Sequence, residues 1–153
     1  MATRSRGVRV RRLGVRDAPR LAGPLSGLFD LPPDPSATRG YLADRRNLFL
    51  LASFGGTPAG FLRGTTLRQV RTRRPQFFLY ELGVTPPLRR RGVGRALIRH
   101  LLAFCRARRY DEVFVLTEPA NRAAVGLYRA TGGRPETPAD RMYVYRLHPR
   151  GRH

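Results

Sequence analysis

The chain has 153 residues, a length that suits one compact domain, and 41% of them are hydrophobic. Its formal net charge is +20, and all 30 lysine-or-arginine positions are arginine. No apolar run approaches the roughly 18 residues of a membrane-spanning helix, and the single cysteine, Cys105, excludes an internal disulfide and fits a reducing compartment. The basic N-terminus leads into alternating valines and lacks the pattern of a secretory signal, so we expect a cytoplasmic protein with no membrane partner.

The N-terminal part of the chain predicts one strand followed by two helices. Alternating apolar residues predict a strand over 8–13. Asp17 is a suitable N-cap for a helix that reaches about Phe29. A proline-rich break follows, and Ser36 can cap a second helix that ends at Ala43.

The middle of the chain predicts three strands. Residues 48–54 are typical of a buried strand, and a glycine-containing turn over 55–58 joins them to a returning strand over 59–67. A basic loop over 68–75 then leads to an apolar run over 77–84, which predicts the central strand.

The last third of the chain alternates helices and strands. Its pattern predicts a helix over 92–108, a strand over 112–117, a helix over 121–131 and a final alternating strand over 142–147. The central strand and its successors thus form a β–α–β unit, whose switch point favours an anion site.

Residues 89–95, Arg-Arg-Arg-Gly-Val-Gly-Arg, join the central strand to the longest predicted helix. The first N–H groups of a helix have no intrahelical partner, and the positive end of the helix dipole points the same way. Glycine at 92 and 94 removes Cβ atoms that would hold an anion away from the backbone. The arginines add charge suited to phosphate oxygens. The turn therefore predicts a cradle for a diphosphate.

Neither familiar nucleotide-binding loop matches this turn. A P-loop requires G-x-x-x-x-G-K-[ST], and the chain contains no lysine. The dinucleotide fingerprint requires G-x-G-x-x-G, and Leu97 stands where the third glycine would be. The remaining pattern, [QR]-x-x-G-x-[GA] with Arg89, Gly92 and Gly94, resembles the coenzyme A pyrophosphate loop of the GCN5-related N-acetyltransferases.

A second motif strengthens this resemblance. Residues 121–133 match the superfamily's pattern N-x-x-A-x-x-L-Y-x-x-x-G at every fixed position, at a separation that fits one helix and one strand. The resemblance covers about residues 8–147. It implies a single N-acetyltransferase domain over 1–153 with flexible ends. The implied fold class is α/β (mixed α+β), the acyl-CoA N-acyltransferase fold, with a mixed, mainly antiparallel sheet flanked by helices.

The resemblance also implies where acetyl-CoA binds. In that fold the strands 77–84 and 112–117 run parallel and splay apart at their C-terminal ends, and the gap admits the pantetheine arm. The residues implied to bind acetyl-CoA are Leu82, Gly83, Val84, Arg89, Arg90, Arg91, Gly92, Val93, Gly94, Arg95, Ala96 and Asn121. Capping of the 121–131 helix is an alternative role for Asn121.

The central strand resembles one particular group within the superfamily. Residues 80–84, Tyr-Glu-Leu-Gly-Val, are similar to the Tyr-Asp-Leu-Ala-Val of aminoglycoside 3-N-acetyltransferases of the gentamicin/fortimicin type. Further similarities lie at 28–30, 41–42, 51–54 and 142–145. Glu81 and Gly83 stand where that pattern has Asp and Ala. These differences weaken the inference about the substrate more than the inference about the family.

The implied chemistry is direct acyl transfer to a primary amine. Glu81 is the candidate base that accepts the ammonium proton, and its alternatives are binding of a cationic substrate or no role beyond solvation. The backbone N–H near Leu82 would donate to the oxyanion. The resemblance implies that Tyr128 protonates the departing thiolate, and an ordinary core aromatic is the alternative.

The expected acceptor is a small cationic molecule, specifically the 3-amino group of an aminoglycoside, which would make the protein an antibiotic-resistance enzyme. The residues expected to bind it are Asp30, Asp34, Tyr80, Glu81, Glu118, Glu136 and Asp140. The alternative acceptor is the amine of a protein or small peptide. The sequence is also compatible with a homodimer.

The net charge of +20 has three interpretations. In the first, the exclusive use of arginine reflects a GC-rich coding background. In the second, the positive charge attracts the acidic coenzyme. The third interpretation is a nucleic-acid-binding module. It rests on charge alone, because the chain has no helix-turn-helix, zinc spacing or RNP-type aromatic strand. We therefore expect no specific nucleic-acid partner, and non-specific association at low salt. The three histidines lack ligand spacing, so no metal site is expected, and Cys105 is expected to be a core thiol.

Overall fold

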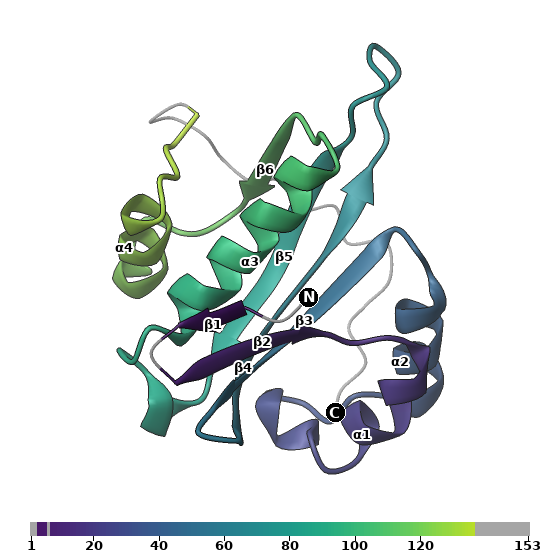
Figure 1. Cartoon of the computed structure of the whole chain (residues 1–153), viewed down its shortest axis with the longest axis vertical. Helices are drawn as coiled ribbons and strands as arrows, with labels where there is room; N and C mark the ends of the chain where they lie inside the picture. Colours follow the sequence, from purple (N-terminus) through teal and green to yellow (C-terminus); the bar gives the residue numbers. More distant parts are fainter. Residues whose placement is uncertain (1–2, 6, 137–153) are drawn as a thin grey trace.

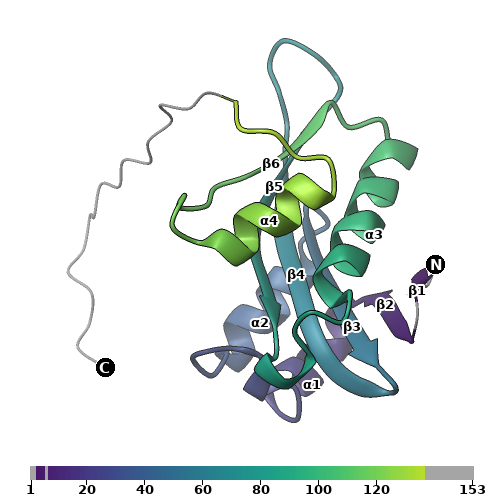
Figure 2. The same cartoon turned by 90° about the vertical axis from the view of Figure 1, so that its left-hand side faces the viewer.

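The structure, a computed structural model, describes residues 3–5 and 7–136, in which one sheet lies between two sets of helices (Figure 1 and Figure 2). Along the chain the elements are β1 (Thr3–Ser5), β2 (Val8–Arg12), η1 (Val15–Asp17), α1 (Ala18–Ala22), η2 (Ser26–Leu28), α2 (Pro35–Ala43), β3 (Asn47–Phe54), β4 (Thr57–Leu67), β5 (Gln76–Val84), η3 (Pro86–Leu88), α3 (Val93–Ala107), β6 (Glu112–Val115) and α4 (Arg122–Ala130).

The sheet has six strands in the order β1-β2-β3-β4-β5-β6. Every neighbouring pair is antiparallel except β5 and β6, which are parallel. The predicted mixed, mainly antiparallel sheet flanked by helices is therefore confirmed. The sequence pattern did not predict β1, a short strand that extends the edge beyond β2.

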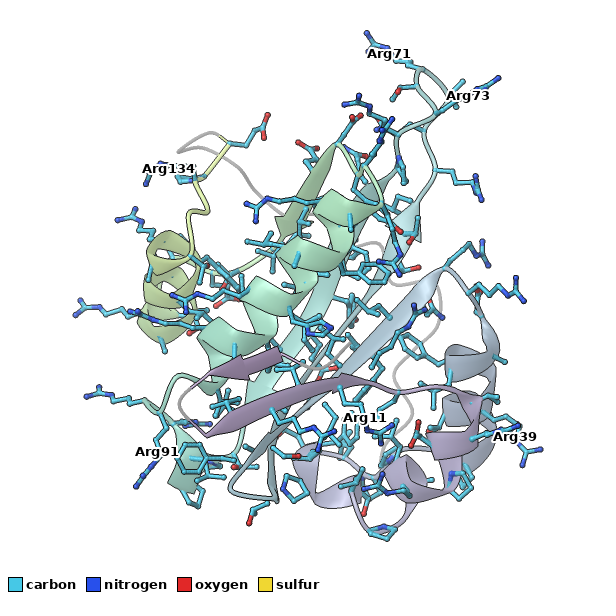
Figure 3. All side chains as sticks on the ribbon, viewed as in Figure 1. Arg11, Arg39, Arg71, Arg73, Arg91 and Arg134 are labelled. Carbon is cyan, nitrogen blue, oxygen red and sulfur yellow. The ribbon has the colours of Figure 1, made fainter. Side chains whose placement is uncertain are left out.

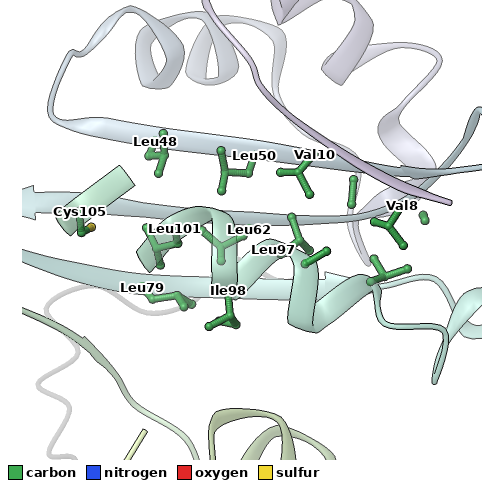
Figure 4. Close-up of a cluster of buried hydrophobic side chains, with 14 of the residues drawn as sticks. Val8, Val10, Leu48, Leu50, Leu62, Leu79, Leu97, Ile98, Leu101 and Cys105 are labelled. Atoms are coloured by element: carbon green, nitrogen blue, oxygen red, sulfur yellow. The ribbon is translucent and has the colours of Figure 1, made fainter. Parts of the chain in front are cut away.

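The main core lies between α3 and one face of the sheet (Figure 4). The apolar stripe of α3, with Leu97, Ile98 and Leu101, packs against alternate strand residues such as Leu62 and Leu79, which are at most 2% exposed. Each such side chain contributes about 1.5–3 kcal/mol when it leaves water. This packing fixes α3, and with it the helix N-terminus that the site uses.

A second core lies on the opposite face, under α1 and α2, around the rings of Phe29, Phe49 and Phe61. The predicted single helix from Asp17 to about Phe29 is wrong. The segment instead forms η1, α1 and η2 in succession. The reason is Pro24, which disfavours helical backbone at the residue before it and has no N–H to continue the helix.

The cap of the second helix also differs from the prediction. Asp34, not Ser36, is the N-cap of α2, and its Oδ1 accepts a hydrogen bond from the N–H of Ala37 at 2.7 Å. Pro35 then takes the first helical position, where its fixed φ fits and its missing N–H costs nothing. Strand β6 ends at Val115, two residues before the predicted end, and the predicted strand over 142–147 lies outside the described residues.

Candidate active site

Strand β5 continues after its pairing with β6 ends. The parallel register runs from Gln76 opposite Glu112 to Leu79 opposite Val115, whereas β5 extends to Val84. Figure 2 shows the chain leaving β6 toward α4, away from the end of β5. Within the described residues, the 80–84 segment therefore has no strand partner on its β6 side. Such an edge can accept an extended chain through backbone hydrogen bonds, and the predicted splay between the two strands is present.

The register between β4 and β5 contains a bulge at this point. Arg63 pairs with Glu81 and Gly64 pairs with Leu79, so Tyr80 is the extra residue. An extra residue shifts the alternation of side chains along the strand, and Tyr80 and Glu81 consequently project to the same face of the sheet, the one opposite α3. The contacts agree, since both side chains lie against the guanidinium of Arg63.

Gly64 makes this close approach of β4 and β5 possible. A Cβ at that position would collide with the carbonyl oxygen of Phe78 and the ring of Phe77. Helix α2 is tied to the same place by Tyr41, whose hydroxyl lies 2.9 Å from the carbonyl oxygens of both Leu48 and Gly64.

Four side chains form what we call the acceptor-face cluster: Tyr41, Arg63, Tyr80 and Glu81. Arg63 Nε donates to Glu81 Oε2 at 2.6 Å, and Arg63 Cζ lies 4.4 Å from the centroid of the Tyr80 ring and 5.8 Å from that of Tyr41. The Glu81 side chain is 41% exposed and Tyr80 is 60% exposed, so both are accessible. Burial raises the pKa of Tyr41 to about 12, although the charge of Arg63 opposes this.

Sequence analysis missed Tyr41 and Arg63 as members of this cluster. The available signal was Arg63 itself, a charge that follows the apolar strand residues 59–62. A charged side chain within a buried strand requires a partner, and here the partner is Glu81.

The turn between β5 and α3 has the features of an anion site. Gly92 is the N-cap of α3 with φ 82°, and among residues 3–5 and 7–136 no side chain caps this end of the helix. A Cβ at Gly92 would meet nothing within 4 Å, so the backbone there faces open space. The side chains of Val93 and Ala96 are buried in the main core. Those two residues can therefore offer only their backbone N–H groups to a ligand.

The arginines of this turn have different surroundings. Arg89 Nε donates to the carbonyl oxygen of Val84 at 3.3 Å, and Arg91 Cζ lies 5.6 Å from the Phe54 ring centroid. Arg90 has a left-handed backbone with φ 60°, and Arg95 is exposed on the first turn of α3. Figure 3 shows Arg91 projecting outward at this end of the molecule.

Gly94 contributes packing, which the sequence interpretation did not include. A Cβ at Gly94 would lie 3.0 Å from Leu127 Cδ2, so this glycine lets α4 approach the start of α3. In α4, Asn121 Oδ1 accepts the N–H of Ala124 at 3.1 Å, which establishes the capping alternative for Asn121. The amide nitrogen of Asn121 is not used in that bond.

Tyr128 lies on α4, half-buried against the main core. Burial raises the pKa of its phenol, so the hydroxyl keeps its proton at neutral pH. Within the described residues this hydroxyl has no hydrogen-bond partner. Its protonated state is what a proton donor requires, and its packing also agrees with a purely structural role.

Among the described acids that are expected to bind the acceptor, only Glu81 belongs to the acceptor-face cluster. The carboxylate of Asp34 caps α2. Asp30, Glu118 and Glu136 are exposed, and their side chains form no hydrogen bond or ion pair with the described residues. Asp140 lies outside the described residues. The structure brings none of the other five carboxylates, which it does describe, into contact with another of them.

Cys105 is 4% exposed, and burial raises the pKa of its thiol to about 12, so it is a core residue and not a nucleophile. Among residues 3–5 and 7–136, no group of three His, Cys, Asp or Glu side chains is arranged to hold a metal ion. In the same part of the chain, no helix is both long and apolar enough to cross a membrane.

Comparisons with known proteins agree on the family. The acetyltransferase (GNAT) family model matches residues 18–132. The N-alpha-acetyltransferase RimI of Mycobacterium tuberculosis is 36% identical over 118 residues, which cover 76% of this chain and 72% of that protein. N-acetyltransferase 8 of Rattus norvegicus is 33% identical over 95 residues, 62% of this chain, and the chain spans only 43% of that longer relative.

Solved structures share the fold. An aminoglycoside acetyltransferase from an uncultured soil metagenomic sample, in complex with trehalose, superposes with a TM-score of 0.78 and 24% sequence identity. The likeness covers 93% of this chain and 97% of that chain.

Proposed function

Because the chain belongs to the acetyltransferase (GNAT) family, whose members use acetyl-CoA, we propose that it transfers the acetyl group of acetyl-CoA directly to a primary amine. The observation that carries this proposal is the bulge at Tyr80. It puts an accessible carboxylate, that of Glu81, on one face of β5, while the N-terminus of α3 follows the end of the same strand. Acetyl-CoA supplies the activated acetyl group as a thioester.

The donor side of the site suits a diphosphate. The uncapped N-terminus of α3, the open space at Gly92 and the arginines at 89, 91 and 95 combine backbone N–H donors with positive charge. The unpaired edge of β5 over 80–84 suits an extended arm with amide groups. These features support binding by Leu82, Gly83 and Val84 through their backbone and by the turn through its N–H groups.

On the acceptor side, Glu81 would take a proton from the ammonium form of the acceptor, and the neutral amine that results would attack the thioester carbonyl. Its Oε2 is fixed by Arg63, and its Oε1 has no hydrogen bond with the described residues. The N–H near Leu82 would donate to the oxyanion, and Tyr128 would give its proton to the departing sulfur. A second role for Glu81, binding a cationic acceptor without accepting its proton, remains the alternative.

For the acceptor we propose the 3-amino group of an aminoglycoside. The side-by-side arrangement of Tyr80 and Glu81 supports this proposal, because an aromatic ring packs against the apolar face of a sugar ring while a carboxylate binds its ammonium group. The exposed carboxylate of Asp30, near the break before α2, could add attraction for a polycation. Because exposed charges beyond about 10 Å are largely screened at ordinary salt, the distant arginines oppose this attraction little, and Arg63 is the positive charge that lies beside Glu81.

The second candidate is the α-amino group of a peptide. It is favoured by the 36% identity with an N-alpha-acetyltransferase over most of both chains. It is also favoured by Arg63, because a guanidinium beside Glu81 could bind the first carbonyl of a peptide but would repel a polycation. Like the aminoglycoside, a peptide presents a primary amine to Glu81.

A competition assay separates the two acceptors. The enzyme is incubated with acetyl-CoA and equal concentrations of gentamicin and a set of short peptides that differ in their first residue. NMR then locates the acetyl group on each product. Acetylation of the 3-amino group of gentamicin supports the first proposal. Acetylation of peptide α-amines alone would replace it with the second.

A further inference from the structure

An arginine-rich loop projects from one end of the molecule between β4 and β5 (Figure 1). We call residues 68–75 the arginine arm. The exposed charged side chains of the arm are Arg68, Arg71, Arg73 and Arg74. Figure 3 shows Arg71 and Arg73 at one end of the molecule and Arg91, in the turn before α3, toward the other end. The charge of the arm therefore lies outside the proposed donor side of the active site.

Hydrogen bonds from neutral donors hold the arginine arm in place. Gln69 Nε2 donates to the carbonyl oxygen of Arg74 at 2.7 Å and to Asp111 Oδ2 at 2.8 Å. The N–H of Arg74 donates to Thr72 Oγ1 at 3.2 Å, and the N–H of Asp111 donates to the carbonyl oxygen of Pro75 at 2.9 Å. None of these contacts uses a guanidinium group, so the arm is ordered while its charges stay available.

The C-terminal end of α3 adds three more exposed arginines: Arg106, Arg108 and Arg109. This end of the helix adjoins the base of the arm, because the Tyr110 hydroxyl lies 2.7 Å from Thr66 Oγ1, two residues before Arg68. Together the arm and the helix end gather seven arginines at one end of the molecule.

The carboxylates beside these arginines do not pair with them. Glutamine amides donate to both, Gln69 to Asp111 and Gln76 to Glu112. The ion pairs among the described residues use other carboxylates, those of Asp17, Asp44 and Glu81. Asp111 and Glu112 keep their negative charges, so they offset part of the positive charge at this end without forming an ion pair with any of its seven guanidinium groups.

We propose that the arginine arm and the C-terminal end of α3 bind the phosphate backbone of a nucleic-acid duplex. Guanidinium groups match phosphate oxygens in shape and charge, and a projecting loop suits an extended polyanion better than a small ligand that must be enclosed. The arm contains no aromatic side chain, so it lacks the stacking platform that single strands use. Val70 is its one fully exposed apolar side chain, too little for insertion into a membrane surface.

The test compares two variants that lose the same charge. Arg71→Ser/Arg73→Ser changes the arm, and Arg16→Ser/Arg39→Ser removes two exposed, unpaired arginines elsewhere. Binding to a fluorescent RNA duplex and a DNA duplex of equal length is measured by anisotropy over a range of salt concentrations. Vesicles that contain phosphatidylserine are the probe for a membrane surface. Acetyl-CoA turnover with the best acceptor amine is measured in parallel.

We expect the wild type to bind at least one duplex, with an affinity that falls steeply as salt rises. In the arm variant the slope of log K against log salt should become smaller by about 2, the value for two lost phosphate contacts. The control variant should keep most of the slope, and turnover should be unchanged in both. A preference for RNA or for DNA would identify the source of the phosphate backbone. Equal losses in the two variants, or binding to neither duplex, with or without binding to vesicles, would overturn the proposal.

Discussion

Arg63 and Glu81 lie opposite each other on β4 and β5, and Arg63 Nε donates to Glu81 Oε2 over 2.6 Å. Both side chains are partly exposed, so the pair contributes only about 0–1 kcal/mol to the free energy of unfolding. Its larger effect is on orientation, because the bond fixes one carboxylate oxygen and leaves the other available. Glu81 can thus face an incoming amine in a defined direction.

Replacement of Arg63 tests this orienting role. In Arg63→Met the carboxylate loses its fixed partner, so we expect turnover to fall about 10- to 100-fold, the scale of a misplaced catalytic group. The affinity for acetyl-CoA should stay unchanged. Arg46→Met is the matched control, because it removes an exposed pair with Asp44 outside the acceptor-face cluster. Steady-state kinetics and calorimetric titration measure both quantities, and equal turnover in the two variants would deny Arg63 this role.

Glu81→Gln separates the two roles open to Glu81. If the carboxylate accepts a proton, kcat falls by about 10²- to 10⁴-fold and KM for the amine changes little. If it only binds a cationic acceptor, KM rises while kcat is kept. We expect the first pattern. Steady-state kinetics with varied amine concentration distinguishes the two, provided that the chemical step limits the rate.

Gly92→Asp tests the anion site, and Gly56→Asp is its control. The two glycines have φ of 82° and 83°, and neither would bring a Cβ within 4 Å of another atom, so the backbone cost of the change is similar. Gly56 lies in the turn between β3 and β4, whereas Gly92→Asp puts a carboxylate at the N-cap of α3. We expect it alone to abolish coenzyme A binding in a calorimetric titration. Wild-type affinity in Gly92→Asp would contradict the assignment of the turn.

Gly94→Asp is a less clean test of the same turn. The new Cβ would press on Leu127, so the variant would disturb the packing of α4 as well as any bound anion. A loss of coenzyme A binding in that variant would not separate the two causes.

Tyr128→Phe tests proton donation to the leaving sulfur. The change removes one hydroxyl that has no partner among the described residues, so folding and coenzyme A affinity should survive. We expect kcat to fall about 10²-fold, the scale of a general-acid contribution. The control is Tyr110→Phe, which loses a hydrogen bond to Thr66 beyond the C-terminal end of α3 and should keep full turnover. If Tyr128→Phe also kept it, Tyr128 would be a core residue only.

Because the phenol of Tyr41 is buried, we expect the free energy of unfolding to change at alkaline pH. Burial raises the pKa of its phenol from 10.0 to about 12, so the folded state holds this proton more tightly than the unfolded chain. The resulting stability is complete below pH 10 and is lost as pH rises toward 12. Tyr41→Phe should cost about 1 kcal/mol at neutral pH, and this difference should shrink between pH 10 and 12. Urea unfolding of both proteins checks this, and a constant difference would contradict it.

Local patterns predicted β2 to β6, the turn before α3 and helix α4 well, because each depends on residues close in sequence. The first helical segment failed at Pro24, where a single backbone restriction outweighed helical periodicity. The acceptor-face cluster could not be predicted, because it depends on the register of β4 against β5. A bulge of one residue decides whether Tyr80 and Glu81 share a face, and nothing within residues 76–84 alone specifies that bulge. It requires Gly64 on the neighbouring strand.

The most direct test of acetyl transfer follows the acetyl carbon itself. The protein is mixed with acetyl-CoA labelled with ¹³C at the carbonyl and with a panel of aminoglycosides, polyamines and peptides, and the label is followed by NMR. We predict that the thioester signal is replaced by an amide signal with at least one amine, with one thiol released for each amide formed. If the thioester persisted with every amine, or if only free acetate formed, the account of this site as an N-acetyltransferase would be wrong.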